Sequence, residues 1–273
     1  TISSNISWTS NLVYSSNFVY DITSNINIET VEYIVNNITS TVTTVSSVAD
    51  PVVTDNGLVA YYKFDTGQEL VDSVGNYPLT NDGSVSFSSS TKISGKSSYF
   101  PNSNNDGFLN ITGGFNPYNI WNGNGISFSI WYNLDYTGTD NAGRIFEFGD
   151  GNINLIWIAT KLTGGNDLSL YAKGGHTGGN GPTASIGTGT MDNTWHHLVW
   201  SIDTSGNWSA FIDGVNQNIS ANWDVPNISG GYTINRLGKS IYHNTNQQDL
   251  KGHLDDFRIY NRVLSQTEIT SLN

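Results

Sequence analysis

The sequence predicts an all-β protein, a sandwich of two antiparallel sheets preceded by an N-terminal stalk segment. Three observations indicate this fold class. The 273 residues include 29 glycines, 14 tyrosines and 8 tryptophans, and only 12% are charged, which is typical of aromatic-rich strands joined by tight turns. From residue 57 onward, short apolar stretches alternate with turn signals. The first basic residue is Lys63, so the composition changes near residue 55.

Residues 1–55 are predicted to be a stalk that joins copies of the chain. Small apolar residues recur at alternating spacings of three and four, which is the pattern of a coiled coil, at Val35, Ile38, Val42, Val45, Ala49 and Val52. Ile and Val at both core positions favour a homotrimer over a dimer. The surrounding Ser, Thr and Asn are poor helix formers, so an extended fibre, or edge strands packed on the next domain, are alternatives.

Residues 56–273 are predicted to be the sandwich domain. Turn signals such as Asp82-Gly83, Asp150-Gly151 and Asp213-Gly214 punctuate this part of the chain. Stretches that read as strands lie at residues 58–64, 85–87, 97–100, 126–134, 144–148, 155–160, 168–173, 195–203, 208–213, 232–238 and 253–260. Many short strands with turns between them predict two packed sheets.

Side-chain alternation shows which face of a strand is buried. Within residues 126–134, large apolar side chains at even positions alternate with Ser127, Ser129, Trp131 and Asn133, so one of the two faces is expected to belong to the core. The last residues follow a different pattern. Ser265 and Glu268 have the spacing of a capping box and predict a final helical turn.

Two adjacent histidines, His196 and His197, lie in the predicted strand "WHHLVWSID". Successive side chains of a strand point to opposite faces, so the pair cannot bind one metal ion. His197 should share a face with Trp195, and His196 should share the other with Leu198. We expect His197 to be partly buried and hydrogen-bonded, and His196 to lie near a sheet edge or groove.

Composition excludes several functions. The net charge of −12 repels nucleic acids and anionic lipid surfaces. Cysteine is absent, so there is neither a thiolate metal site nor a cysteine nucleophile. No apolar run is long enough for insertion into a membrane. Phosphate-binding loops, dinucleotide-binding loops and the common hydrolase motifs are absent as well.

Six segments of the chain, in order, resemble the signature segments of a known family. They are "GLVAYYKFD…DSVGNYPLT", "GKSSYF", "ISFSIWYN", "WHHLVWSID", "WSAFIDGV" and "LKGHLDDFRIYNRVLSQTEI". This order is similar to that of the laminin-G-like, concanavalin-A-like lectin/glucanase jelly-roll domains, over residues 57–273. The resemblance implies two curved antiparallel sheets, commonly a calcium ion at the rim, and roles in adhesion or carbohydrate binding. Fold alone does not give function.

A structural calcium ion is expected near the first and last strands, which the resemblance makes neighbours. Calcium prefers clustered carboxylate, amide and carbonyl oxygens. Of the adjacent pair in the last strand, one carboxylate should point into the core and one outward. The alternative is that the residues after the first strand merely form a turn. The candidate ligands are Asp65, Asp72, Asn76, Asp255 and Asp256.

Glycoside hydrolysis is the main enzymatic alternative on this fold, and it requires two carboxylates that flank the scissile bond. The family's hydrolases carry a Glu-x-Asp-x-x-Glu strand, which this chain lacks. The nearest approach is Glu147 with Asp150, expected at a strand end and in a turn. The chain is therefore predicted not to be an enzyme.

A sugar site needs exposed aromatic rings for stacking and polar groups for the hydroxyls. Loop packing is the alternative role for each candidate, namely Tyr118, Trp121, Asn122, His176, Trp223, Tyr242, His243 and Asn244. With the stalk, these residues predict a lectin-like head of a viral or phage-type fibre, located extracellularly or on a virion. Its partner would be a cell-surface glycan or receptor, with neutral sugars favoured by the net charge. The alternatives are a capsid decoration that binds protein, and a carbohydrate-binding module of a secreted adhesin or glycan-degrading system.

Overall fold

The computed structural model describes residues 55–101, 107–135, 143–150, 154–160, 166–173, 181–222, 232–241 and 249–273. They belong to the second of two units into which the chain divides, Thr54–Asn273. The predicted stalk, coiled coil and trimer concern residues that lie outside the described ranges. Neither helix of the described residues is long and apolar enough to cross a membrane.

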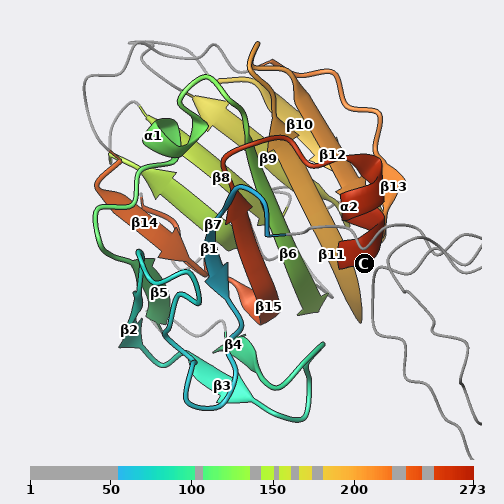
Figure 1. The fold of residues 1–273 in the computed structure, drawn as a ribbon. Coiled ribbons are helices and arrows are strands. Elements are labelled where there is room, and N and C mark those ends of the chain that lie inside the picture. Colours follow the sequence, from blue (N-terminus) through green and yellow to red (C-terminus); the bar gives the residue numbers. More distant parts are fainter. Residues whose placement is uncertain are drawn as a thin grey trace, which may run out of the picture. The chain divides into compact units, whose positions relative to one another are not determined.

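Two antiparallel sheets form a sandwich (Figure 1), which confirms the predicted β architecture. The eight-stranded sheet has the order β13-β12-β11-β6-β15-β4-β3, and β1 also pairs with β15. Its strands are β1 (Leu58–Tyr62), β3 (Ser86–Ser88), β4 (Ser97–Pro101), β6 (Ile126–Asp135), β11 (Asp192–Ile202), β12 (Trp208–Ile212), β13 (Val215–Asn216) and β15 (Lys251–Tyr260).

The seven-stranded sheet has the order β10-β9-β8-β7-β14-β5-β2. Its strands are β2 (Leu79–Gly83), β5 (Gly107–Ile111), β7 (Arg144–Gly149), β8 (Leu155–Thr160), β9 (Leu168–Lys173), β10 (Thr183–Ile186) and β14 (Ile234–Leu237). Every stretch that the sequence predicts as a strand forms one. Strands β2, β5, β10 and β13 are additional, and the Asp82-Gly83 signal lies within β2 instead of in a separate turn.

The core lies between the sheets and is built by side-chain alternation. On β6 the even-numbered residues from Ile126 to Leu134 are fully buried, as the alternation predicts. Aromatic rings from both sheets meet there, with Phe128 of β6 4.8 Å from Phe146 of β7, measured between ring centroids. Burial of such rings dominates core energetics.

Helix α2 (Gln266–Leu272) ends the chain and covers part of the outer face of the eight-stranded sheet (Figure 1). The predicted capping box is present, because Ser265 and Glu268 bond each other's backbone N–H groups. Ile269 packs against Val199, Phe211 and Tyr260. The other described helix, α1 (Pro117–Trp121), was not predicted and contacts β6.

Candidate functional site

A row of side chains crosses the whole seven-stranded sheet on its outer face. Each member lies directly opposite the next one on the neighbouring strand, so the row is fixed by strand register. From edge to edge, this cross-sheet row consists of Thr80, Asn110, Arg236, Glu147, Trp157, Tyr171 and Thr183. Facing side chains of neighbouring strands are close enough to interact.

Alternation explains why this row points outward. On β7, Phe146 and Phe148 enter the core and leave Glu147 between them on the other face. On β8, Ile156 and Ile158 are buried and Trp157 is partly exposed. The other strands repeat the pattern, so the core residues determine which polar and aromatic groups share the outer face.

Planar groups in the middle of the row are stacked. The rings of Trp157 and Tyr171 lie parallel, with centroids 4.8 Å apart and planes 9° apart. The guanidinium of Arg144 lies over Trp157 at 4.4 Å from the ring centroid, a favourable cation–π arrangement. A bulge between Arg144 and Phe146 brings Arg144 to this face. The stack therefore fixes three planar side chains side by side.

Glu147 is a fully buried carboxylate at the centre of the row. Its Oε2 atom accepts a hydrogen bond from Arg144 Nε at 2.5 Å. Its other oxygen, Oε1, has no hydrogen-bond partner within the described part of the chain. A buried acceptor that lacks a donor costs about 1–3 kcal/mol, so this atom is a site of unused bonding capacity.

Arg236 lies next to Glu147 on the adjacent strand. Its guanidinium packs over the Phe108 ring at 4.3 Å, and one terminal nitrogen donates to the Ser240 carbonyl at 3.2 Å. Its Nε atom is buried and finds no acceptor among the described residues. Burial lowers the pKa of Arg236, while the charge of Glu147 opposes that shift. The centre of the row thus holds one unused acceptor and one unused donor.

The segment around the end of β14 borders this face. Lys239 Nζ lies 3.9 Å from Asp249 Oδ2 and 5.8 Å from the centroid of the Phe108 ring. The backbone closes at the same place, because Leu250 donates to the Gly238 carbonyl. Lys239 and Asp249 are both buried. The border therefore adds a charged pair beside Arg236.

The sequence-predicted ligand residues lie elsewhere or outside the described ranges. Tyr118, Trp121 and Asn122 come together at α1, where Trp121 is only 8% exposed and its Nε1 donates to the Asp203 carbonyl. Asn122 caps the helix in a left-handed conformation. Residues outside the described ranges are His176, Trp223, Tyr242, His243 and Asn244. Sequence reasoning missed Trp157 and Tyr171, although alternation in "LIWIAT" and "LSLYAK" places both rings outward.

The expected position of Glu147 was wrong. It lies inside β7 instead of at the strand end, because the strand continues to Gly149. Asp150 follows the strand as predicted, and its carboxylate accepts bonds from the Asn154 backbone and side chain. Asp150 is therefore engaged in local turn chemistry.

The candidate calcium ligand Asp72 is saturated with backbone donors. It is 3% exposed, and its two oxygens accept hydrogen bonds from the backbone N–H groups of Tyr61, Val74, Asn76 and Tyr77 at 2.9–3.0 Å. The carboxylate closes the turn after β1.

The remaining acidic candidates hold the chain in similar ways. Asp65 accepts from Lys96 N, and Asp255 accepts from Ile93 N and Ser94 N. Asp256 accepts from the Tyr61 hydroxyl. Strands β1 and β15 are neighbours as the resemblance implies, but among the described residues no three acidic or histidine side chains form a group able to hold a metal. The calcium site therefore stays a prediction, and it would need amide or carbonyl oxygens beside these carboxylates.

The expectation that one of Asp255 and Asp256 points into the core was wrong. A bulge between Asp255 and Arg258 inserts one extra residue. Asp255 lies opposite Trp131, and Asp256 contacts Tyr61, so both carboxylates belong to the outer side of the sheet. The core side of this strand is occupied by Leu254 and Phe257.

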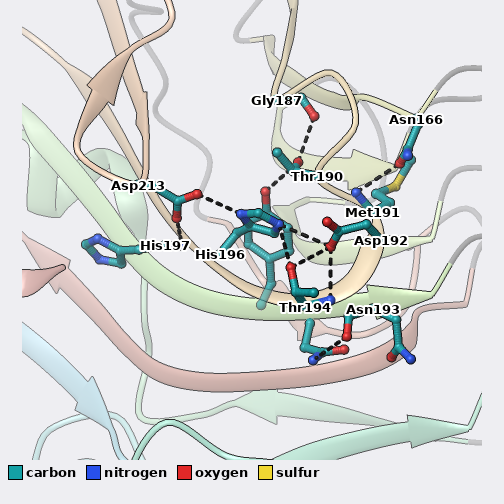
Figure 2. A network of polar contacts seen from close by, with 12 residues as sticks. Asn166, Gly187, Thr190, Met191, Asp192, Asn193, Thr194, His196, His197 and Asp213 are labelled. Carbon is teal, nitrogen blue, oxygen red and sulfur yellow. Dashed lines mark hydrogen bonds and ion pairs between the residues drawn. The ribbon is translucent and has the colours of Figure 1, made fainter.

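The two histidines diverge as predicted (Figure 2). His197 is buried and lies 2.8 Å from Ser129 Oγ, and burial lowers its pKa to about 4. His196 points the other way, with Asp213 2.7 Å from Nδ1 and Asp192 3.2 Å from Nε2. Asp213 also accepts from His197 N. This network ties β11 to the turn after β12.

Comparison with known proteins gives the same fold. A family model described as the concanavalin A-like lectin/glucanases superfamily matches residues 94–270. Among solved structures, domain 4 of AbnA, a GH43 extracellular arabinanase of Geobacillus stearothermophilus solved with arabinotriose, is 23% identical with a TM-score of 0.54. The alignment covers 79% of this chain and 97% of that domain. No curated protein sequence matches the chain.

Binding domains of botulinum neurotoxins are also similar. A structure of botulinum neurotoxin type C, a toxin whose cell entry depends on interaction with two ganglioside molecules, is 16% identical with a TM-score of 0.60. The binding domain of neurotoxin DC, solved with rat synaptotagmin II, is 15% identical with a TM-score of 0.60. Each alignment covers 81% of this chain but 52% of the toxin chain, so the chain spans about half their length. Identities this low show a common fold.

Proposed function

The chain belongs to the concanavalin A-like lectin/glucanase superfamily, and we propose that it is a non-enzymatic module that binds a glycan on the cross-sheet row. The observation that carries the proposal is the parallel, partly exposed pair of rings of Trp157 and Tyr171 in that row. Arg236 of the same row is also partly exposed and can donate to a sugar hydroxyl.

The surroundings of Glu147 and Arg236 suit a carbohydrate. Partly exposed Trp157 and Tyr171 supply rigid apolar edges, and Asn110 and Thr183 supply polar groups farther along the same row. Binding sites typically combine aromatic surface with a few fixed polar groups. The solved arabinanase domain was seen with arabinotriose, which supports a glycan ligand for this fold.

Binding without cleavage follows from the charges. Hydrolysis needs a carboxylic acid with a raised pKa and a second carboxylate across the bond. Glu147 is the single carboxylate of the cross-sheet row, so the row supplies only one of the two carboxylates that hydrolysis requires.

In its biological setting, we propose the domain as the attachment head of a viral or phage-type fibre, extracellular or on a virion, with the N-terminal segment as a trimeric stalk. Three linked heads raise avidity by ~10²–10⁴ without new contacts, so weak single-site binding suffices. A structural decoration protein and a secreted carbohydrate-binding module are the alternatives. A protein receptor is the second candidate partner, supported by the toxin domain solved with synaptotagmin II.

Glycan arrays probed with the wild type and two variants test the proposal. Trp157→Ala with Tyr171→Ala should abolish binding, because it removes the aromatic part of the row. Trp195→Ala removes a partly exposed ring from the other sheet and should leave binding intact. Release of reducing ends would contradict the non-enzymatic role. Tight binding to a protein in the absence of any glycan signal would favour the receptor or decoration alternative.

A further inference from the structure

Basic side chains gather on and beside the cross-sheet row. Four of the 11 basic residues of the chain lie on or beside this face, namely Arg144, Lys173, Arg236 and Lys239. Arg144 is paired with Glu147, and Lys239 lies near Asp249.

Arg236 and Lys173 make no ion pair within the described part of the chain. The carboxylate of Asp82, on the edge strand β2, acts on Arg236 only through its charge, and it accepts a hydrogen bond from Thr80. Arg236 is partly exposed and occupies the row position between Asn110 and Glu147. Lys173 lies on the same face, two residues beyond Tyr171.

We infer that the glycan held on the cross-sheet row is acidic and that its carboxylate pairs with Arg236. The inference rests on the proposed function and specifies the class of ligand. A planar guanidinium fixed over Phe108 presents its nitrogens in a geometry that suits a carboxylate. Lys173 adds attraction from the Tyr171 side, and the stacked rings contact the apolar parts of the sugar.

The net charge of −12 does not oppose this ligand, although it favours neutral sugars at the level of composition. Surface charges more than about 8 Å away are largely screened at physiological ionic strength. The ligand therefore responds to the groups of the row. There, Arg144 is paired with Glu147, while Arg236 has no paired carboxylate among the described residues.

A matched pair of probes tests the inference. One is a neutral oligosaccharide, and the other is the same oligosaccharide with its C6 hydroxyl groups oxidised to carboxylates. Calorimetry with the full chain should show that the wild type binds the oxidised form about tenfold more tightly, the effect of one charge-assisted contact. The preference should shrink at about 1 M salt, where the screening length is about 3 Å.

Three variants make the test specific. Arg236→Gln should bind both probes with equal affinity, because the preference for the oxidised form depends on the guanidinium. Arg236→Lys should keep part of the preference, and thermal melting checks that both variants fold. Lys92→Gln makes the same change in net charge at an exposed position on another part of the surface and should behave like the wild type.

The outcomes separate the two proposals. Equal binding of both probes by the wild type, or an unchanged preference in Arg236→Gln, overturns the acidic-ligand inference and leaves the proposed function standing. Failure of the wild type to bind either probe contradicts the proposed function and this inference together. A preference that Lys92→Gln also loses would assign the effect to overall charge and overturn the role of Arg236.

Discussion

Two buried carboxylates, Asp72 and Glu147, have different hydrogen-bonding environments. Both oxygens of Asp72 accept hydrogen bonds, four in all and all from backbone N–H groups. Glu147 is more deeply buried, yet one of its oxygens lacks a donor among the described residues. A buried carboxylate with a structural role is expected to have both oxygens hydrogen-bonded. The unpaired oxygen of Glu147 distinguishes its environment in the cross-sheet row from that of Asp72 in the turn after β1.

Replacing each acid by its amide should sharpen this comparison and give the largest effect. In Asp72→Asn, an NH₂ group would face two backbone donors, so we expect a loss of about 2–4 kcal/mol in the free energy of unfolding. In Glu147→Gln, the NH₂ group can take the unpaired Oε1 position, which offsets part of the cost of removing the charge partner of Arg144, so the loss should be smaller than in Asp72→Asn. Urea unfolding of both variants measures the difference. Equal losses would contradict the distinction.

A smaller effect is expected from Asp255, which belongs to the same end of the molecule as Asp72. Burial raises its pKa to about 7, although the hydrogen bonds from Ile93 N and Ser94 N oppose that shift. The folded state then holds a proton that the unfolded state releases, so this group's contribution to stability declines as pH rises from about 4 to 7.

The Asp255→Asn variant isolates that contribution. Its stability relative to the wild type should rise across the same pH range, measured by urea unfolding at each pH. The variant must be compared with the wild type at each pH, because His197 changes stability in the opposite direction. Burial lowers the pKa of His197 to about 4, so its contribution to stability rises between about pH 4 and 6.5. A constant difference between wild type and variant would show that Asp255 does not titrate there.

The smallest expected effect is that of metal removal. The calcium ion predicted from the sequence stays a prediction, and the bonds of Asp65, Asp72 and Asp255 to backbone donors indicate that these residues do not need one. EDTA should leave the melting temperature unchanged, because only an ion bound by the folded state stabilises it. A lower melting temperature in EDTA, restored by added calcium, would contradict this.

Much of the fold could be read from local pattern. Alternation in residues 126–134 identified the core face of β6, and the spacing of Ser265 and Glu268 identified the cap of α2. Side-chain alternation and helix capping depend on residues that are close together in the chain, so both can be predicted directly from the sequence. Strands β2, β10 and β13 were missed because they are short, polar edge strands. Pairing with other strands, instead of local propensity, makes them extended.

The candidate site depended on tertiary structure. By itself the sequence determined which side chains of a strand share a face, and hence that His196 and His197 diverge. It could not determine that Arg236 lies beside Glu147, or that Asp72 meets Tyr61 N. Those contacts join segments far apart in the chain, and strand order and register set them. Register is fixed by the fit of the whole core, because a slip of one residue would turn every buried side chain outward.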